Sequence, residues 1–151
     1  TEEELAILQG HTYHTFRILD TIGGMPQISE WAAFHHERLD GKGYPFGHGA
    51  KDLTLGSRIM AVADTFTAIT EDRPYRKGMK DEESLNVMTH MTANGALDGE
   101  IVNILRRNYD EIKDIRQDTQ VDYSKKQRHL AQLMGFLPGM VSNSPKESAT
   151  I

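Results

Sequence analysis

Apolar residues in the first part of the chain recur at intervals of three and four, a spacing that predicts helices. Thr1 and Glu4 have the spacing of a capping box, so a first helix is expected to begin at once. The pair Gly23–Gly24 is a stop signal that predicts its end. A second helix is expected from Ile28 to about His36.

Glycines and prolines between about Leu39 and Asp52 predict an irregular loop, in which glycines 41 and 43 are expected to adopt positive φ. A third and strongly apolar helix is expected from Leu55 to Ile69. Asp81 is expected to cap a fourth helix. A fifth should follow Asp98, with a single apolar stripe that continues as far as Ile112. No alternating strand pattern occurs, so the predicted fold class is all-α.

The composition becomes polar beyond Asp114. We expect residues 1–118 to form one helical domain. Residues 119–141 are expected to hold a short docking helix capped by Ser124, and residues 142–151 a disordered tail. This gives about five helices with a sixth near the C-terminus.

The 151 residues carry a formal charge of −5 and no cysteine. The negative charge argues against a nucleic acid duplex as a partner, but it leaves room for a small phosphorylated ligand. Without cysteine, a metal ion would have to be held by histidine, carboxylates and water. No apolar run is long enough for a membrane helix, and we expect a cytoplasmic location.

The segment HHERLDGKGYP, residues 35–45, is the first candidate site. Consecutive helical residues diverge by about 100°, so His35 and His36 can reach one site beside the helix, or serve two different ions. The alternative is that both histidines only decorate a helix end on the surface.

Asp64 strengthens the metal interpretation, because Met60 and Ala61 precede it by one turn and Ala68 follows it. A carboxylate buried on so apolar a face would need a cation or several hydrogen bonds. The alternative is an exposed aspartate on a two-sided helix. His11 lies on a third segment that can contribute a ligand, three residues before His14.

The segment RPYRK, residues 73–77, forms a second candidate cluster directly after the third helix and includes Arg73, Tyr75, Arg76 and Lys77. Three cations and an aromatic ring can hold a phosphate and stack on a base. Cations at this place can also merely neutralise a helix C-terminus.

Together these stretches resemble the HD-GYP family, a branch of the HD superfamily of metal-dependent phosphohydrolases. The family pattern HHExxDGxGYP is matched over residues 35–45, and a later match runs from Asp64 to Arg76. The resemblance covers about residues 1–115 and implies an HD-type helical bundle. It implies hydrolysis of cyclic di-GMP to pGpG and GMP in bacterial signal transduction.

By this resemblance the metal ligands are His11, His35, His36 and Asp64. The residues expected near the substrate are Arg73, Tyr75, Arg76 and Tyr44. Two or three divalent ions are implied for the intact domain, with Fe or Mn favoured over Ni or Zn. Beyond these ligands the resemblance assigns no catalytic residue here. The Gly43–Tyr44–Pro45 loop would shape the substrate entrance or contact other signalling domains.

The family's earlier motif, a His-Asp pair followed by Gly-Lys, has no match, because no His-Asp dipeptide occurs. We therefore expect the chain to be the C-terminal part of a longer domain, to lack the N-terminal helices, and to be inactive alone. Two alternatives stay open: a non-catalytic module that binds a cyclic dinucleotide or a signalling partner, and a phosphohydrolase for other nucleotides.

Overall fold

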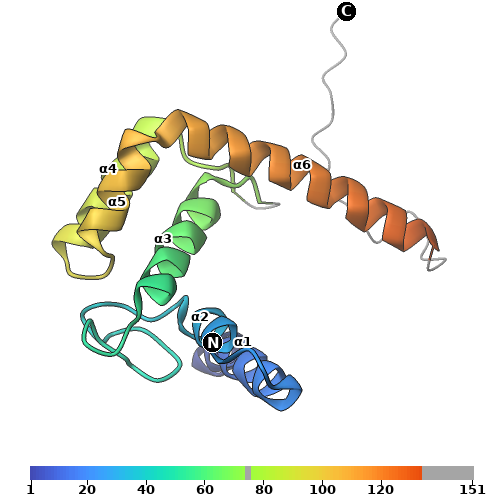
Figure 1. Ribbon diagram of the computed structural model, residues 1–151. Coiled ribbons are helices and arrows are strands. Elements are labelled where there is room, and N and C mark those ends of the chain that lie inside the picture. The colour runs from blue at the N-terminus through green and yellow to red at the C-terminus, as the bar shows by residue number, and fades with distance from the viewer. Residues whose placement is uncertain (74–75, 134–151) are drawn as a thin grey trace, which may run out of the picture. The chain divides into compact units, whose positions relative to one another are not determined.

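The computed structural model describes residues 1–73 and 76–133, except for the side chains of residues 2, 5, 6 and 8. It contains six helices in this part of the chain and no strand beyond an isolated bridge between Arg73 and Arg76 (Figure 1). The predicted all-α class is confirmed. No helix among the described residues is long and apolar enough to cross a membrane.

Helix α1 spans Glu2–Ile22 and begins with the predicted capping box. The Thr1 hydroxyl accepts a hydrogen bond from the backbone N–H of Glu4 at 3.3 Å. The helix ends at Gly23, whose φ of 73° is costly for any residue with a Cβ. Helix α2, Pro26–Phe34, packs beside α1 and has Pro26 in its first turn, where a missing N–H costs nothing.

Helix α3 spans Leu55–Thr70 and contacts helices α2, α4 and α5. Its N-terminus is fixed to α2, because the Glu30 carboxylate accepts hydrogen bonds from Thr54 at 2.6 Å and from Ser57 at 3.1 Å. The buried side chains of α3 include Ala61, Val62 and Phe66. This helix is therefore the centre of the unit formed by residues 1–107.

Helices α4, Asp81–Ala93, and α5, Gly99–Arg107, complete this unit. The prediction that Asp81 caps α4 is wrong: Lys80 is the N-cap, and its backbone N–H donates to Glu83 at 3.2 Å. Asp98 does precede α5 as predicted, and its carboxylate accepts from the N–H of Glu100 at 2.9 Å.

The apolar core of this unit lies mainly around α3, α4 and α5 and the segments that enter them. It consists of Ala33, Leu53, Ala61, Val62, Phe66, Met88, Ala96, Leu97, Val102 and Leu105.

Two predictions about the C-terminal part are wrong. The fifth helix does not continue to Ile112, because α5 ends at Arg107 and a new helix, α6, spans Tyr109–Leu133. Ser124 caps nothing and lies inside α6. No glycine or proline interrupts this stretch, and an i,i+4 ion pair between Asp122 and Lys126 at 2.7 Å supports its polar middle.

The chain divides into two compact units, and the boundary lies between residues 107 and 108. The expected boundary at 118 stays a prediction, as does docking by the C-terminal helix. The expected tail, residues 142–151, lies outside the described residues.

Candidate metal centre

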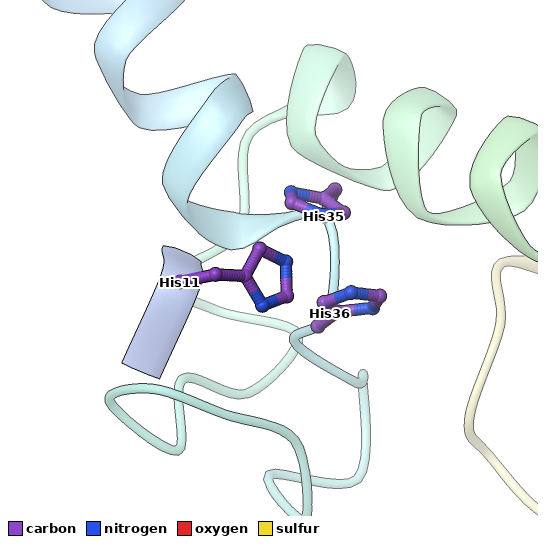
Figure 2. Close-up of side chains that lie close together, drawn as sticks. All are labelled: His11, His35 and His36. Atoms are coloured by element: carbon purple, nitrogen blue, oxygen red, sulfur yellow. The ribbon is translucent and has the colours of Figure 1, made fainter. Parts of the chain in front are cut away.

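Three histidines, one within a helix and two just after the end of another, converge on one place. His11 comes from the middle of α1, while His35 and His36 follow the last residue of α2. One ring nitrogen of each lies within 4.8 Å of those of the other two. Figure 2 shows the three imidazoles close together, so residues 24 positions apart in the sequence form a single cluster.

The spacing of this cluster suits a metal ion. Two imidazole nitrogens that bind the same ion at about 2.1 Å stand roughly 3 to 4 Å apart. The upper limit of 4.8 Å is close enough that small rotations of the rings bring all three nitrogens into range. Imidazole donors suit the transition metals Zn, Fe, Ni and Cu, and they do not suit Mg or Ca.

His35 is prepared as a ligand by the end of its own helix. Its Nδ1 lies 2.8 Å from the carbonyl oxygen of Ala32. A carbonyl can only accept, so Nδ1 carries a proton, and in the neutral ring the lone pair is then on Nε2. A histidine ligand commonly donates its other ring N–H to a backbone carbonyl in this way, which fixes both its tautomer and its orientation.

Asp64 joins the cluster through His36. Its carboxylate oxygen lies 3.5 Å from the Nδ1 of His36. The expectation that Asp64 is buried is wrong, because its side chain is 39% exposed. Met60 and Thr67, each about one turn from Asp64, are exposed too, whereas the helix buries Ala61, Val62 and Phe66. Asp64 thus lies on an open face.

The electrostatics favour the neutral form of His36. Burial lowers the pKa of His36 below its usual value; the neighbouring His35 and His11 act in the same direction, and the Asp64 carboxylate acts against them. A neutral imidazole keeps the lone pair that a cation needs. The donor set of three imidazoles and one nearby carboxylate therefore fits a divalent transition metal.

Tyr44 lies against the same histidines. Its ring centroid is 4.8 Å from that of His36 and 6.5 Å from that of His11. Burial, followed by the negative charge of Asp64, raises the pKa of the Tyr44 phenol. Tyr44 lies in the GYP loop, residues 43–47, and is thus part of the candidate centre.

The loop approaches the histidines so closely because of Gly43. A Cβ at this position would lie 2.5 Å from both the Cα of Glu37 and the backbone nitrogen of Arg38. Gly41 has the expected positive φ of 72°. Gly43 does not: the expectation for Gly43 is wrong, and its lack of a side chain serves close backbone approach instead.

The two arginines of the second cluster are both exposed and follow α3. The backbones of Arg73 and Arg76 pair with each other, and the Arg76 guanidinium donates to the carbonyl of Ala68 at 2.6 Å. Ala68 is one turn beyond Asp64, so Arg76 is fixed to the same helix as the carboxylate. Tyr75 lies outside the described residues. Both histidines of α1 are exposed, but His11 lies in the cluster, whereas His14 lies beside Tyr13.

Reasoning from the sequence missed the role of Glu37. This carboxylate is 1% exposed, and one of its oxygens accepts hydrogen bonds from two backbone N–H groups of the loop. Its place inside an otherwise polar motif hid the burial. The signal that was available is the run of small and turn-forming residues ten positions later, whose backbone groups need an acceptor.

The family model for the HD domain matches residues 1–101. The chain belongs to the HD domain family. The match runs through α1, α2 and α3 and so includes all the clustered residues. Membership implies a divalent metal site in this domain, and it confirms the resemblance and the helical bundle expected from the sequence.

Curated relatives support this assignment. The chain is 41% identical over 107 residues to 3'3'-cGAMP-specific phosphodiesterase 1 of Vibrio cholerae, covering 71% of this chain and 25% of the relative. It is 35% identical over 102 residues to a cyclic di-GMP phosphodiesterase of Pseudomonas aeruginosa, and the match covers 67% of this chain and 24% of the relative. It is 34% identical over 123 residues to a cyclic di-GMP phosphodiesterase of Thermotoga maritima, with 74% of this chain and 33% of the relative covered. The chain thus matches about a quarter to a third of the length of these relatives.

Proposed function

We propose that this HD domain chain belongs to a metal-dependent phosphodiesterase that hydrolyses cyclic di-GMP to pGpG and GMP in bacterial second-messenger signalling. The observation that carries the proposal is the convergence of His11, His35 and His36 beside Asp64 and Tyr44. Relatives of this chain are phosphodiesterases for cyclic di-GMP or 3'3'-cGAMP, so both molecules are candidate substrates. The cytoplasmic location remains a prediction.

The proposed roles follow from the chemistry of each side chain. The three neutral imidazoles and the Asp64 carboxylate would hold divalent ions, with Mn or Fe favoured. The bound metal would polarise a phosphoryl oxygen and lower the pKa of a water molecule. Hydrolysis adds the oxygen of one water to phosphorus, and the ribose 3′ oxygen leaves with a proton to give a linear dinucleotide.

The cations after α3 would bind the substrate rather than the metal. Arg73 and Arg76 are exposed, and guanidinium groups bind phosphate through paired hydrogen bonds. Because Arg76 is fixed to α3 one turn from Asp64, it would keep a phosphate near the carboxylate side of the centre. Tyr44 and Tyr75 would contact the sugar or base.

The charge balance limits what the clustered residues do alone. Three neutral imidazoles and one carboxylate contribute a single negative charge against two divalent ions. We propose that the 151-residue chain alone binds one ion weakly and turns over substrate negligibly, and that further anionic ligands complete the centre in the whole enzyme.

The test is to purify the protein that the gene encodes and load it separately with Mn²⁺, Fe²⁺, Ni²⁺ and Zn²⁺. Cyclic di-GMP and 3'3'-cGAMP are then supplied, and the linear products are separated by chromatography. We expect metal-dependent hydrolysis that is lost in His35→Ala and Asp64→Ala and kept in His14→Ala. Hydrolysis that survives both ligand variants would refute the proposed centre. Binding of a cyclic dinucleotide without hydrolysis under every metal would favour the non-catalytic module.

A further inference from the structure

Glu37 is a buried carboxylate directly after the candidate ligand His36. It is 1% exposed, although carboxylates are rarely buried without partners. Burying an ionisable group this fully is unfavourable unless hydrogen bonds replace its water. Its surroundings therefore show what the carboxylate is there to hold.

One oxygen of Glu37 holds the far end of the GYP loop. Its Oε1 accepts hydrogen bonds from the backbone N–H of Phe46 at 2.7 Å and of Gly47 at 3.1 Å. These loop amides lie nine and ten residues away in the sequence, so the contact closes the loop.

The near end of the loop is held by His36, the residue before Glu37. The backbone N–H of Tyr44 donates to the carbonyl oxygen of His36 at 3.2 Å. Residues 44–47 are thus tied at both ends to residues 36 and 37. This places the Tyr44 ring 4.8 Å from the His36 ring, and 6.5 Å from that of His11 on the neighbouring helix.

Glu37 also meets the helix that carries Asp64. With Arg58 and Ala61 of α3 it lines a small cavity on the core side. Its second oxygen, Oε2, is buried and has no hydrogen-bond partner within the described part of the chain. The side chain thus bonds the loop through one oxygen only, and Oε1 is the atom whose acceptor chemistry matters.

We propose that Glu37 is a positioning residue, which holds Tyr44 against the rings of His36 and His11 and so keeps these two histidines in place for the metal ion. It contacts neither substrate nor metal in this role. The metal part rests on the proposed function, whereas the anchoring of the loop does not.

The first experiment measures the anchoring without any metal. Amide hydrogen exchange of the 151-residue chain is followed by NMR for wild type, Glu37→Ala and Glu37→Gln. In Glu37→Ala we expect the amides of Phe46 and Gly47 to exchange at least about tenfold faster, because their acceptor is gone. Glu37→Gln keeps an acceptor oxygen of the same reach, so its exchange should stay within about threefold of wild type.

A core variant separates anchoring from general loss of stability. Met88→Ala, which removes a fully buried side chain from α4, should speed exchange broadly without singling out Phe46 and Gly47. Protection of these two amides that persists in Glu37→Ala would overturn the proposal. The proposal would also be overturned if these two amides exchanged as fast in Glu37→Gln as in Glu37→Ala, because an acceptor oxygen at position 37 would then not be what protects them.

The second experiment tests positioning by titrating Mn²⁺ into the same variants. We expect Glu37→Ala to weaken Mn²⁺ binding by about three- to tenfold, Glu37→Gln to restore it, and Met88→Ala to leave it unchanged under conditions where it is folded. Because Glu37 acts through Tyr44, Tyr44→Ala combined with Glu37→Ala should bind no more weakly than the weaker single variant.

The two experiments fail in different ways. Additive losses in the double variant, or unchanged Mn²⁺ affinity with an unprotected loop, would overturn the positioning role while leaving the proposed function intact. If the wild-type protein encoded by the gene binds no Mn²⁺, Fe²⁺, Ni²⁺ or Zn²⁺, the proposed function fails and the positioning role fails with it, whatever the amide exchange shows.

Discussion

Helices α1 and α3 each present one candidate metal ligand, yet they are packed very differently. Helix α3 buries Ser57, Ala61, Val62 and Phe66. Among the described side chains of α1, Thr12 is the buried one, while Ile18 and Ile22 are 63% and 65% exposed. The same centre therefore draws His11 from a lightly packed helix and Asp64 from the open face of a well-packed one.

This difference teaches that the core and the centre depend on different contacts. Stability of the unit comes mainly from the apolar side chains around α3, α4 and α5. The geometry of the histidines comes from polar and aromatic contacts at the end of α2 and in the GYP loop. Variants should therefore damage one property and spare the other.

The sharpest test is to remove a ligand. His35→Ala should weaken Mn²⁺ binding by about a hundredfold or more, since one of few strong donors is lost. Its free energy of unfolding should change by less than about 1 kcal/mol without metal, because the side chain adds little to the core. His14→Ala, an exposed histidine on α1, is the matched control and should bind as wild type does. Calorimetry and urea unfolding measure the two properties; an equal loss of metal affinity in both variants would break the comparison.

The converse test removes core volume. Met88→Ala should lower the free energy of unfolding by about 2 to 5 kcal/mol, the range for large-to-small changes at buried sites. Met60→Ala, at a methionine on α3 that is 41% exposed, should cost less than about 1 kcal/mol. Urea titrations monitored by circular dichroism give both values. Comparable losses at the two methionines would mean that the core is not where the buried side chains indicate.

A glycine variant tests the contact between the GYP loop and the residues that follow α2. Gly43→Ala should cost about 1 to 3 kcal/mol, because its Cβ would meet backbone atoms of residues 36–38 that cannot rotate away. It should also weaken Mn²⁺ binding through displacement of Tyr44. Gly49→Ala is the control, since its Cβ would meet no atom nearer than 3.6 Å. If Gly43→Ala were as stable as Gly49→Ala, the loop would not be pressed against the helix end.

The smallest effect expected is a pH dependence. The pKa of His36 is lowered in the folded chain, so the unfolded chain binds a proton first as the pH falls below about 6.5. Without metal, protonation of His36 should not affect stability well above pH 6.5 and should destabilise the fold progressively below it. His36→Gln should therefore show a shallower loss of stability than wild type between pH 7 and 5.5. Urea midpoints at the two pH values measure this, and identical slopes would contradict the assigned direction.

The sequence predicted the helices best where periodicity and end signals agreed, as at Thr1, Gly23 and Asp98. It failed for α6, because a polar helix without an apolar stripe gives no periodic signal, and a capping pattern within it was misleading. The three histidines that cluster in the structure could be singled out in the sequence because their residue types are distinctive. Burial was misjudged at Asp64 and was not predicted at all for Glu37, because it depends on which neighbouring elements cover each carboxylate.

The hydrogen bond from His35 to Ala32 fixes the ring of a candidate ligand, and it can form only because a helix ends there. The carbonyl of Ala32 is available to a side chain because it lies in the last turn of α2, where backbone acceptors lack the usual partner four residues on. Extending the helix would give that carbonyl a backbone partner and free the ring of His35 to change tautomer. A paired-histidine motif placed in the middle of a designed helix would thus reproduce the sequence of this site but not its geometry. To transfer the site, a design would have to include the helix end together with the histidines.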